Sequence, residues 1–333
     1  MKPSLLLSLV LSVLVVSFIS ALTIGAADLT FNQVLLSLFG NVDEAGTVAH
    51  SIIWQLRMPR SILAFVAGCG LAMAGLILQT ITRNPLADPY LFGISSGASF
   101  GVVIVMTLTG VGFGFYLSFA AFLGSLLAIS LLLLIAGFNR HQQVESMLLA
   151  GVALSFLFSS FTSLMLYWSD PQAVSAILFW TLGSFSRAQW DLLWFPCLVV
   201  ISCLGLMLAK QRQLNAVLLG DEGAVTLGVN VNRLRITMLL LSSILTASIV
   251  ALCGGIGFVG LMIPHIVRFF IGQGGRLSLI ITALVGGVFM LWVDIASRVI
   301  LDNQELPIGI ITAAVGSLFF LTLLYVRKRK SVI

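Results

Sequence analysis

Charged residues are scarce in this chain of 333 residues, and their scarcity excludes an ordinary soluble domain. Only 9% of the residues are Asp, Glu, Lys or Arg, whereas 59% are hydrophobic, and the mean hydropathy is +1.12. Soluble proteins carry about 25% charged residues. The basic residues flank apolar runs and form no stripe, so the net charge of +5 indicates orientation in a lipid bilayer and predicts no nucleic-acid partner.

Residues that ligate metals or act as nucleophiles are also few. The four cysteines lie inside apolar runs without CxxC spacing, and the three histidines form no HExxH motif. We therefore expect the cysteines to be small buried side chains. We predict no metal site, no cofactor, no catalytic residue and no enzymatic activity. A membrane-embedded hydrolase is disfavoured because no Ser/His pair stands at a suitable depth.

Apolar runs of about the length that a bilayer requires, roughly 20 residues, repeat along the chain. They predict an all-α, polytopic membrane protein, with residues 1–333 forming a single transmembrane domain. The first run exceeds the roughly 7–15 residues of a signal-peptide core, so we predict a span there. The ten predicted spans are 4–24, 59–80, 91–110, 115–138, 146–168, 191–209, 234–253, 256–270, 277–297 and 307–326.

The span 256–270 is the shortest, is rich in glycine and contains Pro264. Without the turn at Gly254-Gly255, a helix over 234–270 would be too long for a bilayer. Ten spans with a cytoplasmic N-terminus also place all but four of the 17 Lys and Arg residues on the cytoplasmic side. We therefore predict that both termini are cytoplasmic.

The four exceptions are arginines on the outer side: Arg57, Arg60, Arg187 and Arg298. Positive charge there opposes the usual preference, which favours a function for Arg57, Arg60 and Arg298. The alternative is that these side chains pair with nearby acids or extend to the membrane interface. Asp294 stands four residues before Arg298, a spacing that allows a local ion pair.

The centres of the predicted spans carry almost no ionisable side chains, and only Asp294 comes close. Ion-coupled carriers use intramembrane Asp, Glu or His residues. A secondary carrier is therefore disfavoured. The chain would draw energy from a partner or act as a passive pore.

Glycines in the spans predict close helix packing. Gly68, Gly75 and Gln79 share one helical face, and Gln79 would line a pathway or, as we favour, bond to a neighbouring helix. In the segment 214–235, Asp221 and Glu222 are expected to cap a short helix that Gly228 ends. Its exposed face would comprise Ala224, Val225 and Leu227, and either a docking element or a solvated connector fits this pattern.

Eight segments in order carry a resemblance to a known family. They are RMPR, GLAMAGLILQ, RNPLADP, LLAGVALS, LLGDEGAVTLGV, GFVGLMIPHIVR, DIASR and ELPIGIITAAVGSLFFL. The chain resembles the FecCD family, the permease subunits of type II ATP-binding-cassette (ABC) importers for iron–siderophore, haem and cobalamin. The resemblance runs nearly end to end. It implies ten helices per subunit and a homodimer or a pair of related permeases.

The resemblance also implies two cytoplasmic ATPase subunits, a binding protein that delivers substrate from outside, and a location in the bacterial inner membrane. Arg57, Arg60 and Arg298 match positions that dock the binding protein, and Val144 and Glu145 match the cytoplasmic gate. Glu145 departs from the small hydroxyl residue of the cobalamin member. The ATPase-coupling positions are Asp221, Glu222, Gly223, Leu227 and Gly228, and the pathway candidates are Gln79 and Asn84.

From these residues we predict an importer subunit for ferric siderophores or haem, with cobalamin as the alternative substrate. Oxyanion import is a smaller possibility. An ion-coupled secondary carrier is the alternative from another class.

Overall fold

The computed structural model describes residues 3–25, 27, 29–40, 46–110, 114–136 and 143–330, and it is built from helices in these ranges. Eight described helices are long and apolar enough to cross a bilayer. They are α1 (Pro3–Thr23), α5 (Met58–Thr82), α7 (Phe115–Ala136), α8 (Gln143–Tyr167), α10 (Trp190–Leu218), α12 (Val231–Cys253), α14 (Arg276–Val299) and α15 (Ile308–Lys330). The predicted all-α membrane fold is confirmed.

Two shorter apolar helices, α6 (Ile94–Thr109) and α13 (Val259–Ile271), lie at two further predicted spans. The predicted count of ten spans is not confirmed, because these two helices are shorter than a spanning helix. The predicted turn at Gly254-Gly255 lies where α12 ends, and Gly254 has a φ of 71°. α13 begins only after Phe258, three residues later than predicted.

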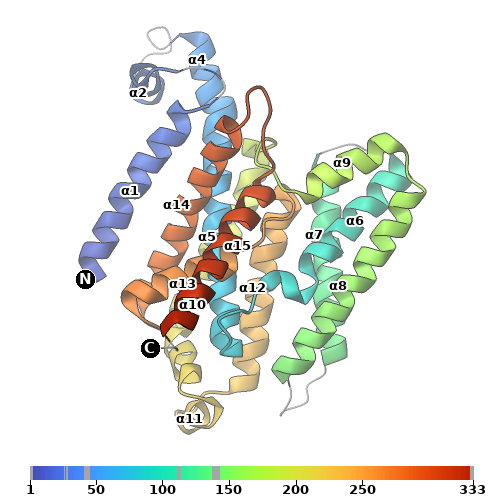
Figure 1. Cartoon of the computed structure of the whole chain (residues 1–333), viewed down its shortest axis with the longest axis vertical. Coiled ribbons are helices and arrows are strands. Elements are labelled where there is room, and N and C mark those ends of the chain that lie inside the picture. Colours follow the sequence, from blue (N-terminus) through green and yellow to red (C-terminus); the bar gives the residue numbers. More distant parts are fainter. Residues whose placement is uncertain are drawn as a thin grey trace.

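Short elements that hydropathy does not predict lie mostly at the ends of the bundle. They are α2 (Phe31–Phe39), α4 (Thr47–Ser51), the π-helical turn η1 (Ile52–Arg57), the 3₁₀ turn η2 (Pro89–Phe92), α9 (Pro171–Thr181) and α11 (Asp221–Thr226). Figure 1 shows α2 and α4 at one end and α11 at the other. We call the first the arginine end, because Arg57 ends η1 and Arg60 lies in the first turn of α5 there, and the second the α11 end.

α5 is the central helix of the bundle. The apolar window of the helical stretch that contains it is 83% buried, whereas the windows of α1 and α15 are 17% buried. α5 packs against α10, α12, α13 and α14. Gly68 contacts the backbone of Gly286 in α14, and Gly75 contacts the backbone of Gly260 in α13. The predicted small-residue face is therefore confirmed as a packing surface.

We expect Gly75→Ala to lower the stability of the permease by at least about 1–3 kcal/mol, the range for overpacked cores. A Cβ at Gly75 would lie 2.0 Å from the carbonyl oxygen of Gly260, and a backbone atom cannot rotate away. The control is Gly205→Ala in α10, where a Cβ meets nothing within 4 Å. Thermal unfolding in detergent measures both variants. Equal midpoints for the two would contradict this account of the α5–α13 contact.

Candidate functional sites

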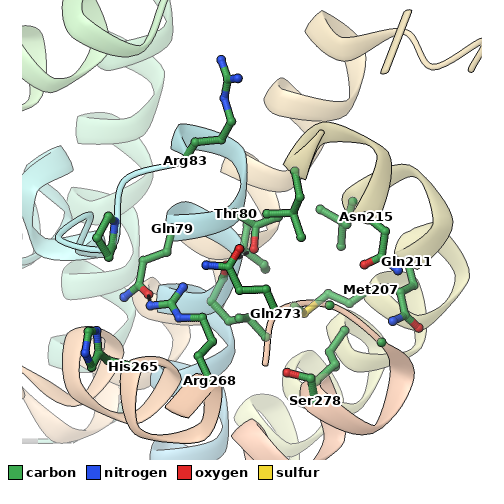
Figure 2. A pocket seen from close by; sticks show the side chains of 18 of the residues that line it. Gln79, Thr80, Arg83, Met207, Gln211, Asn215, His265, Arg268, Gln273 and Ser278 are labelled. Atoms are coloured by element: carbon green, nitrogen blue, oxygen red, sulfur yellow. Dashed lines mark hydrogen bonds between the residues drawn. The ribbon is translucent and has the colours of Figure 1, made fainter. Parts of the chain in front are cut away.

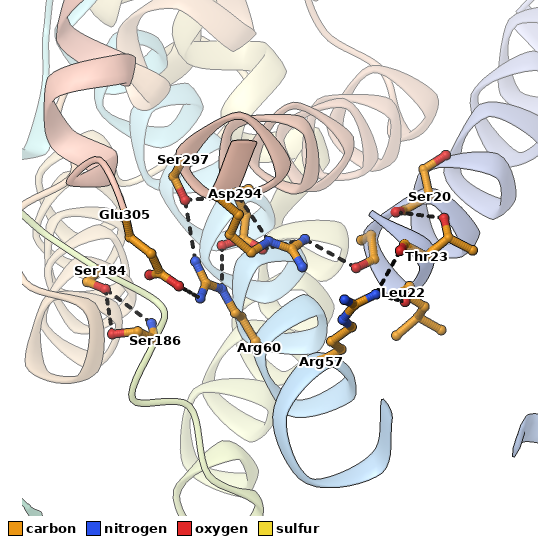
Figure 3. A network of polar contacts seen from close by, with 12 residues as sticks. Ser20, Leu22, Thr23, Arg57, Arg60, Ser184, Ser186, Asp294, Ser297 and Glu305 are labelled. Carbon is orange, nitrogen blue, oxygen red and sulfur yellow. Dashed lines mark hydrogen bonds and ion pairs between the residues drawn. The ribbon is translucent and has the colours of Figure 1, made fainter. Parts of the chain in front are cut away.

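Arg60 is the centre of a polar network at the arginine end (Figure 3). Its Nε lies 2.8 Å from Oδ1 of Asp294, and its Nη1 lies 2.6 Å from Oε1 of Glu305. Nη2 of Arg60 also donates to Oγ of Ser297, at 3.3 Å. The side chain of Asp294 is fully buried, whereas that of Glu305 is 46% exposed. Arg60 therefore pairs with one inaccessible carboxylate and one that solvent reaches.

Arg298 and Arg57 extend this network to α1. Nη2 of Arg298 lies 3.1 Å from Oδ2 of Asp294 and donates to the carbonyl of Ala21, at 3.2 Å. The predicted local pair of Asp294 and Arg298 is thus confirmed. Nη1 of Arg57 donates to the carbonyl oxygens of Leu22 and Thr23, at 2.6 and 2.8 Å. These carbonyls belong to the last turn of α1, where a helix has unbonded acceptors and a negative dipole end.

The network ties α1, α5, α14 and the segment 300–307 together. The side chains of Arg60 and Arg298 are only 11% and 7% exposed. Arg60 and Arg298 therefore pair with nearby acids, as the alternative to a docking function predicted. Docking by these residues stays a prediction. Glu305 is the member of the network through which a partner has access.

Gln79 lies at a cavity of about 430 Å³ between α5, α10, α13 and α14 (Figure 2). The side chain of Gln79 is 2% exposed, and its Nε2 donates to the carbonyl of Gly260 at 2.9 Å. Its Oε1 accepts a bond from Arg268. The favoured interpretation, a bond to a neighbouring helix, is confirmed. Its role in a pathway stays a prediction.

Asn84 shapes the turn that follows α5. Its Oδ1 accepts a bond from the backbone N–H of Leu86, at 2.9 Å, and its carbonyl accepts one from Ala87, at 3.2 Å. Arg83, with a φ of 51°, ends the helix before it, and Asp88 caps η2 through the N–H of Tyr90. The Asn84 side chain is therefore engaged in local structure. Its assignment to a pathway remains untested.

Asp221 does not cap α11 with its side chain, contrary to the prediction. The N-cap is Gly220, with a φ of 105° that favours glycine. Both carboxylate oxygens of Asp221 instead accept from Nη2 of Arg235 in α12, at 2.9 and 3.0 Å. Nη2 of Arg83 lies 3.4 Å from Oδ1 of Asp221. Asp221 thus joins α11 to α12 and to the end of α5.

The exposed face of α11 differs from the predicted one by a single residue. Val225 and Leu227 are 61% and 62% exposed, and Leu219 beside them is 73% exposed, whereas Ala224 is fully buried. Gly228 follows with a φ of 76°, as expected of a residue that ends a helix. Glu222 is exposed and Gly223 is half-buried. Three large apolar side chains, Leu219, Val225 and Leu227, are therefore exposed at the α11 end.

Val144 and Glu145 lie in the first turn of α8, and their side chains fall outside the described residues. All four cysteines are unpaired, with Cys197 half-buried and the others buried. Across the described part of the chain, no group of three or more His, Cys, Asp or Glu side chains could hold a metal ion.

Sequence reasoning missed a groove of about 260 Å³ between α6, α8 and α9, which we call the hydroxyl groove. Its lining consists of Ser95, Ser96, Ser99, Ser159, Thr162, Ser163, Thr181, Leu166, Ile177 and Leu178. Oγ1 of Thr162 is buried there without a hydrogen-bond partner. A signal was present, because the hydroxyl residues repeat at spacings of three and four within two apolar runs.

Comparison with known proteins gives one family match and close relatives. A family described as the FecCD transport family matches residues 13–326. The haemin transport permease HmuU of Yersinia pestis is 37% identical, over 99% of this chain and 97% of that protein. The cobalamin import permease BtuC of Halobacterium salinarum is 38% identical, over 84% and 75%. The Fe(3+) dicitrate permease FecC of Escherichia coli is 35% identical, over 93% and 91%.

A solved structure also matches over nearly the whole chain. It is a metal-chelate type ABC transporter in an inward-facing conformation, with a TM-score of 0.86 and 33% sequence identity. The match covers 97% of this chain and 99% of that one.

Proposed function

This chain belongs to the FecCD transport family, and we propose that it moves ferric siderophores or haem into the cytoplasm as the permease subunit of an ABC importer. It is a membrane transport component and not an enzyme, because ATP hydrolysis in such importers belongs to a separate subunit. The observation that carries the proposal is the end-to-end match to import permeases together with the structural match. Cobalamin is the alternative substrate, which a cobalamin permease among the relatives supports.

The proposed topology has ten spans in one transmembrane domain, with α6 and α13 counted among them and both termini in the cytoplasm of a bacterial cell. Two placements support it. The arginine end and the α11 end lie at opposite ends of the bundle (Figure 1). α1 begins and α15 ends in the half of the molecule that also holds α11. Inverted-membrane proteolysis of the C-terminal segment would test the orientation.

The proposed assembly joins this chain to a second permease copy, two ATPase subunits and an outer substrate-binding protein. ABC permeases of this family work with ATPase and substrate-binding partners as a permease pair. We place the ATPase contact at Asp221, Glu222, Gly223, Leu227 and Gly228, and a cytoplasmic gate at Val144 and Glu145. The apolar exposed face of α11 supports the first placement, since such a face suits a partner groove. Gln79 and Asn84 remain pathway candidates.

Docking of the binding protein is placed at Arg57, Arg60 and Arg298, and the network suggests how it would occur. Asp294 is fully buried and stays bound to Arg60 and Arg298. The Glu305 side chain is 46% exposed, and its Oε1 lies 2.6 Å from Nη1 of Arg60. An incoming carboxylate of the binding protein would replace Glu305 on Arg60, which keeps the guanidinium paired throughout.

We expect Glu305→Gln to strengthen binding-protein docking about 2–5-fold, because the exchange would no longer displace an ion pair of about 0.5–1 kcal/mol. The combined reversal of Arg57 and Arg60 to Glu should abolish docking. Binding of the labelled binding protein to the permease–ATPase complex measures both. Asp302→Asn, an exposed acid in the same segment, is the control. Weaker docking of Glu305→Gln would mean that Glu305 supports the interface and is not displaced.

Reconstitution tests the function itself. The permease, its ATPase and its binding protein are placed in proteoliposomes, and ATP-dependent uptake of haemin, ferric siderophores and cobalamin is measured. Uptake of an iron chelate supports the proposal, and uptake of cobalamin alone supports the alternative. Uptake that follows an ion gradient without ATP would instead indicate a secondary carrier.

A further inference from the structure

The cavity of about 430 Å³ between α5, α10, α13 and α14 (Figure 2) has a basic lining, and we call it the Arg268 cavity. Its titratable side chains are those of Arg83, His265 and Arg268, and among the residues that the structure describes no Asp or Glu lines it. Its polar lining also includes Gln79, Asn215, Gln273 and Ser278. A lining that offers cations, amides and a hydroxyl but no carboxylate is suited to an anion.

Arg268 is the cation that serves this cavity. Figure 2 shows its guanidinium beside the side chains of Gln79 and Gln273, whereas Arg83 extends away from them. Nη2 of Arg83 instead approaches Oδ1 of Asp221, at 3.4 Å. Nη2 of Arg268 donates to Oε1 of Gln79, and within the described part of the chain Arg268 forms no ion pair. A half-buried guanidinium with donors to spare therefore lacks a counter-ion from its own chain.

The loop after α13 brings the beginning of a helix to the same cavity. Gly274 and Gly275 line it, with φ of 82° and 94°, and Gly275 is the N-cap of the 24-residue helix α14 without a side-chain cap. The first backbone N–H groups of a helix have no partner within it and carry its positive dipole end. Ser278 adds a hydroxyl from the first turn of α14. These donors and the Arg268 guanidinium border one space, as in sites for phosphate groups.

The surroundings of the cavity favour an anion that a lipid carries. α10 is a peripheral helix whose apolar window is 28% buried, and Leu206, next to the lining residue Met207, is 49% exposed. Phe269 also lines the cavity, and Phe269 and Phe270 are 84% and 61% exposed. Apolar side chains exposed on a membrane bundle contact acyl chains. Because Arg268 lies in the last turn of α13, a lipid held against these side chains would bring its phosphate to the guanidinium.

We propose that the Arg268 cavity binds a phosphodiester anion, presented by the headgroup of an anionic phospholipid such as phosphatidylglycerol in the leaflet at the α11 end. Basic pockets between membrane helices hold such headgroups. Phosphatidylcholine carries the same phosphate with a quaternary ammonium group, for which the described lining offers no acid. The cavity takes no lining residue from α6, α8, α9 or α15, so this site is separate from the hydroxyl groove and does not depend on the transported solute.

Lipid retention by the delipidated permease–ATPase complex tests the site. Native mass spectrometry measures phosphatidylglycerol and phosphatidylcholine bound from an equal mixture. The unaltered complex should prefer phosphatidylglycerol, and Arg268→Gln should lower its retention about tenfold, the effect of losing a charge-assisted hydrogen bond. Arg276→Gln is the control, because Arg276 is an exposed arginine at the start of α14 that does not line the cavity. Retention by Arg268→Gln that equals that by Arg276→Gln, or equal retention of the two lipids, would overturn the site.

Thermal unfolding with and without lipid separates binding from any effect of the substitution on folding, because each variant serves as its own reference. Added phosphatidylglycerol should raise the midpoint of the unaltered complex and of Arg276→Gln, and leave that of Arg268→Gln unchanged. Arg268→Lys keeps the charge without the planar fork and should retain part of the shift. An undiminished shift in Arg268→Gln would contradict the role of Arg268.

Inorganic phosphate, added to the delipidated complex, distinguishes the two sources of the anion. At a concentration matched to that of the lipid it should leave the midpoint unchanged, because it lacks the acyl chains that lie against Phe269 and Leu206. A midpoint raised by inorganic phosphate and not by phosphatidylglycerol would place a soluble phosphate in the cavity and overturn the lipid assignment.

Discussion

Replacement of both Arg60 and Arg298 by methionine is expected to destabilise the permease by about 3–5 kcal/mol, the cost of leaving a buried charge unpaired. Asp294 has no exposed side-chain surface, and these two arginines bind its two carboxylate oxygens. Methionine keeps much of the volume and removes both cations. The result would be a large fall in the thermal unfolding midpoint in detergent, together with poor recovery of folded protein.

Asp294→Asn added to this double variant should restore most of the midpoint, because it removes the unpaired charge. A loss of packing alone would not be restored in this way. Arg187→Met, an exposed arginine at the same end, is the control and should shift the midpoint little. If Asp294→Asn fails to rescue the double variant, charge pairing is not the basis of the effect.

The main membrane helices were predictable because hydropathy reports directly on transfer into lipid. The first predicted span, 4–24, differs by one residue at each end from α1. The predicted span 59–80 underestimates its helix, since the helical stretch runs over Thr47–Thr82. Its first part lies beyond the predicted apolar run and includes the π-helical turn η1. α2 and α9 were missed because, with 9 and 11 residues, they are too short to be read as spans.

Whether an ion pair could be predicted depended on how far apart its partners stand in the sequence. The Asp294–Arg298 pair follows from spacing on one helix, whereas the partners Arg60 and Asp294 stand 234 residues apart and meet only through the packing of α5 on α14. Asp221 was predicted as a helix cap from local rules. The tertiary bond to Arg235 replaces that role, because Gly220 already supplies the backbone geometry of the cap. Local propensity was therefore right about the short helix and wrong about the use of its acid.

The difference between local and tertiary information also explains why the hydroxyl groove was not predicted. Its serines and threonines are visible in the sequence, but each of the two helical faces alone would pass as ordinary small-residue packing. Only the placement of α9 beside α6 and α8 gathers them around one cavity. A site shared between helices distant in sequence is set by packing, and composition cannot reveal it.

Asp221→Asn is expected to uncouple ATP hydrolysis from transport, lowering uptake at least tenfold while the ATPase still binds and hydrolyses. Asp221 holds α11 to Arg235 in α12 and approaches Arg83 at the end of α5, but its substitution leaves the exposed apolar face of α11 unchanged. Motion of a bound ATPase would then reach α11 without being passed to the membrane helices. Uptake and hydrolysis are measured in the same proteoliposomes.

Leu227→Asp should give a different result. Leu227 is 62% exposed on the face proposed to meet the ATPase, and a charge there opposes burial in an apolar contact. We expect the ATPase to be lost from the purified complex, with uptake and permease-dependent hydrolysis lost together. Leu324→Asp, a similarly exposed leucine on α15, should retain the ATPase. If Asp221→Asn instead releases the ATPase, the bond to Arg235 shapes the docking face itself, and α11 serves as an attachment point alone.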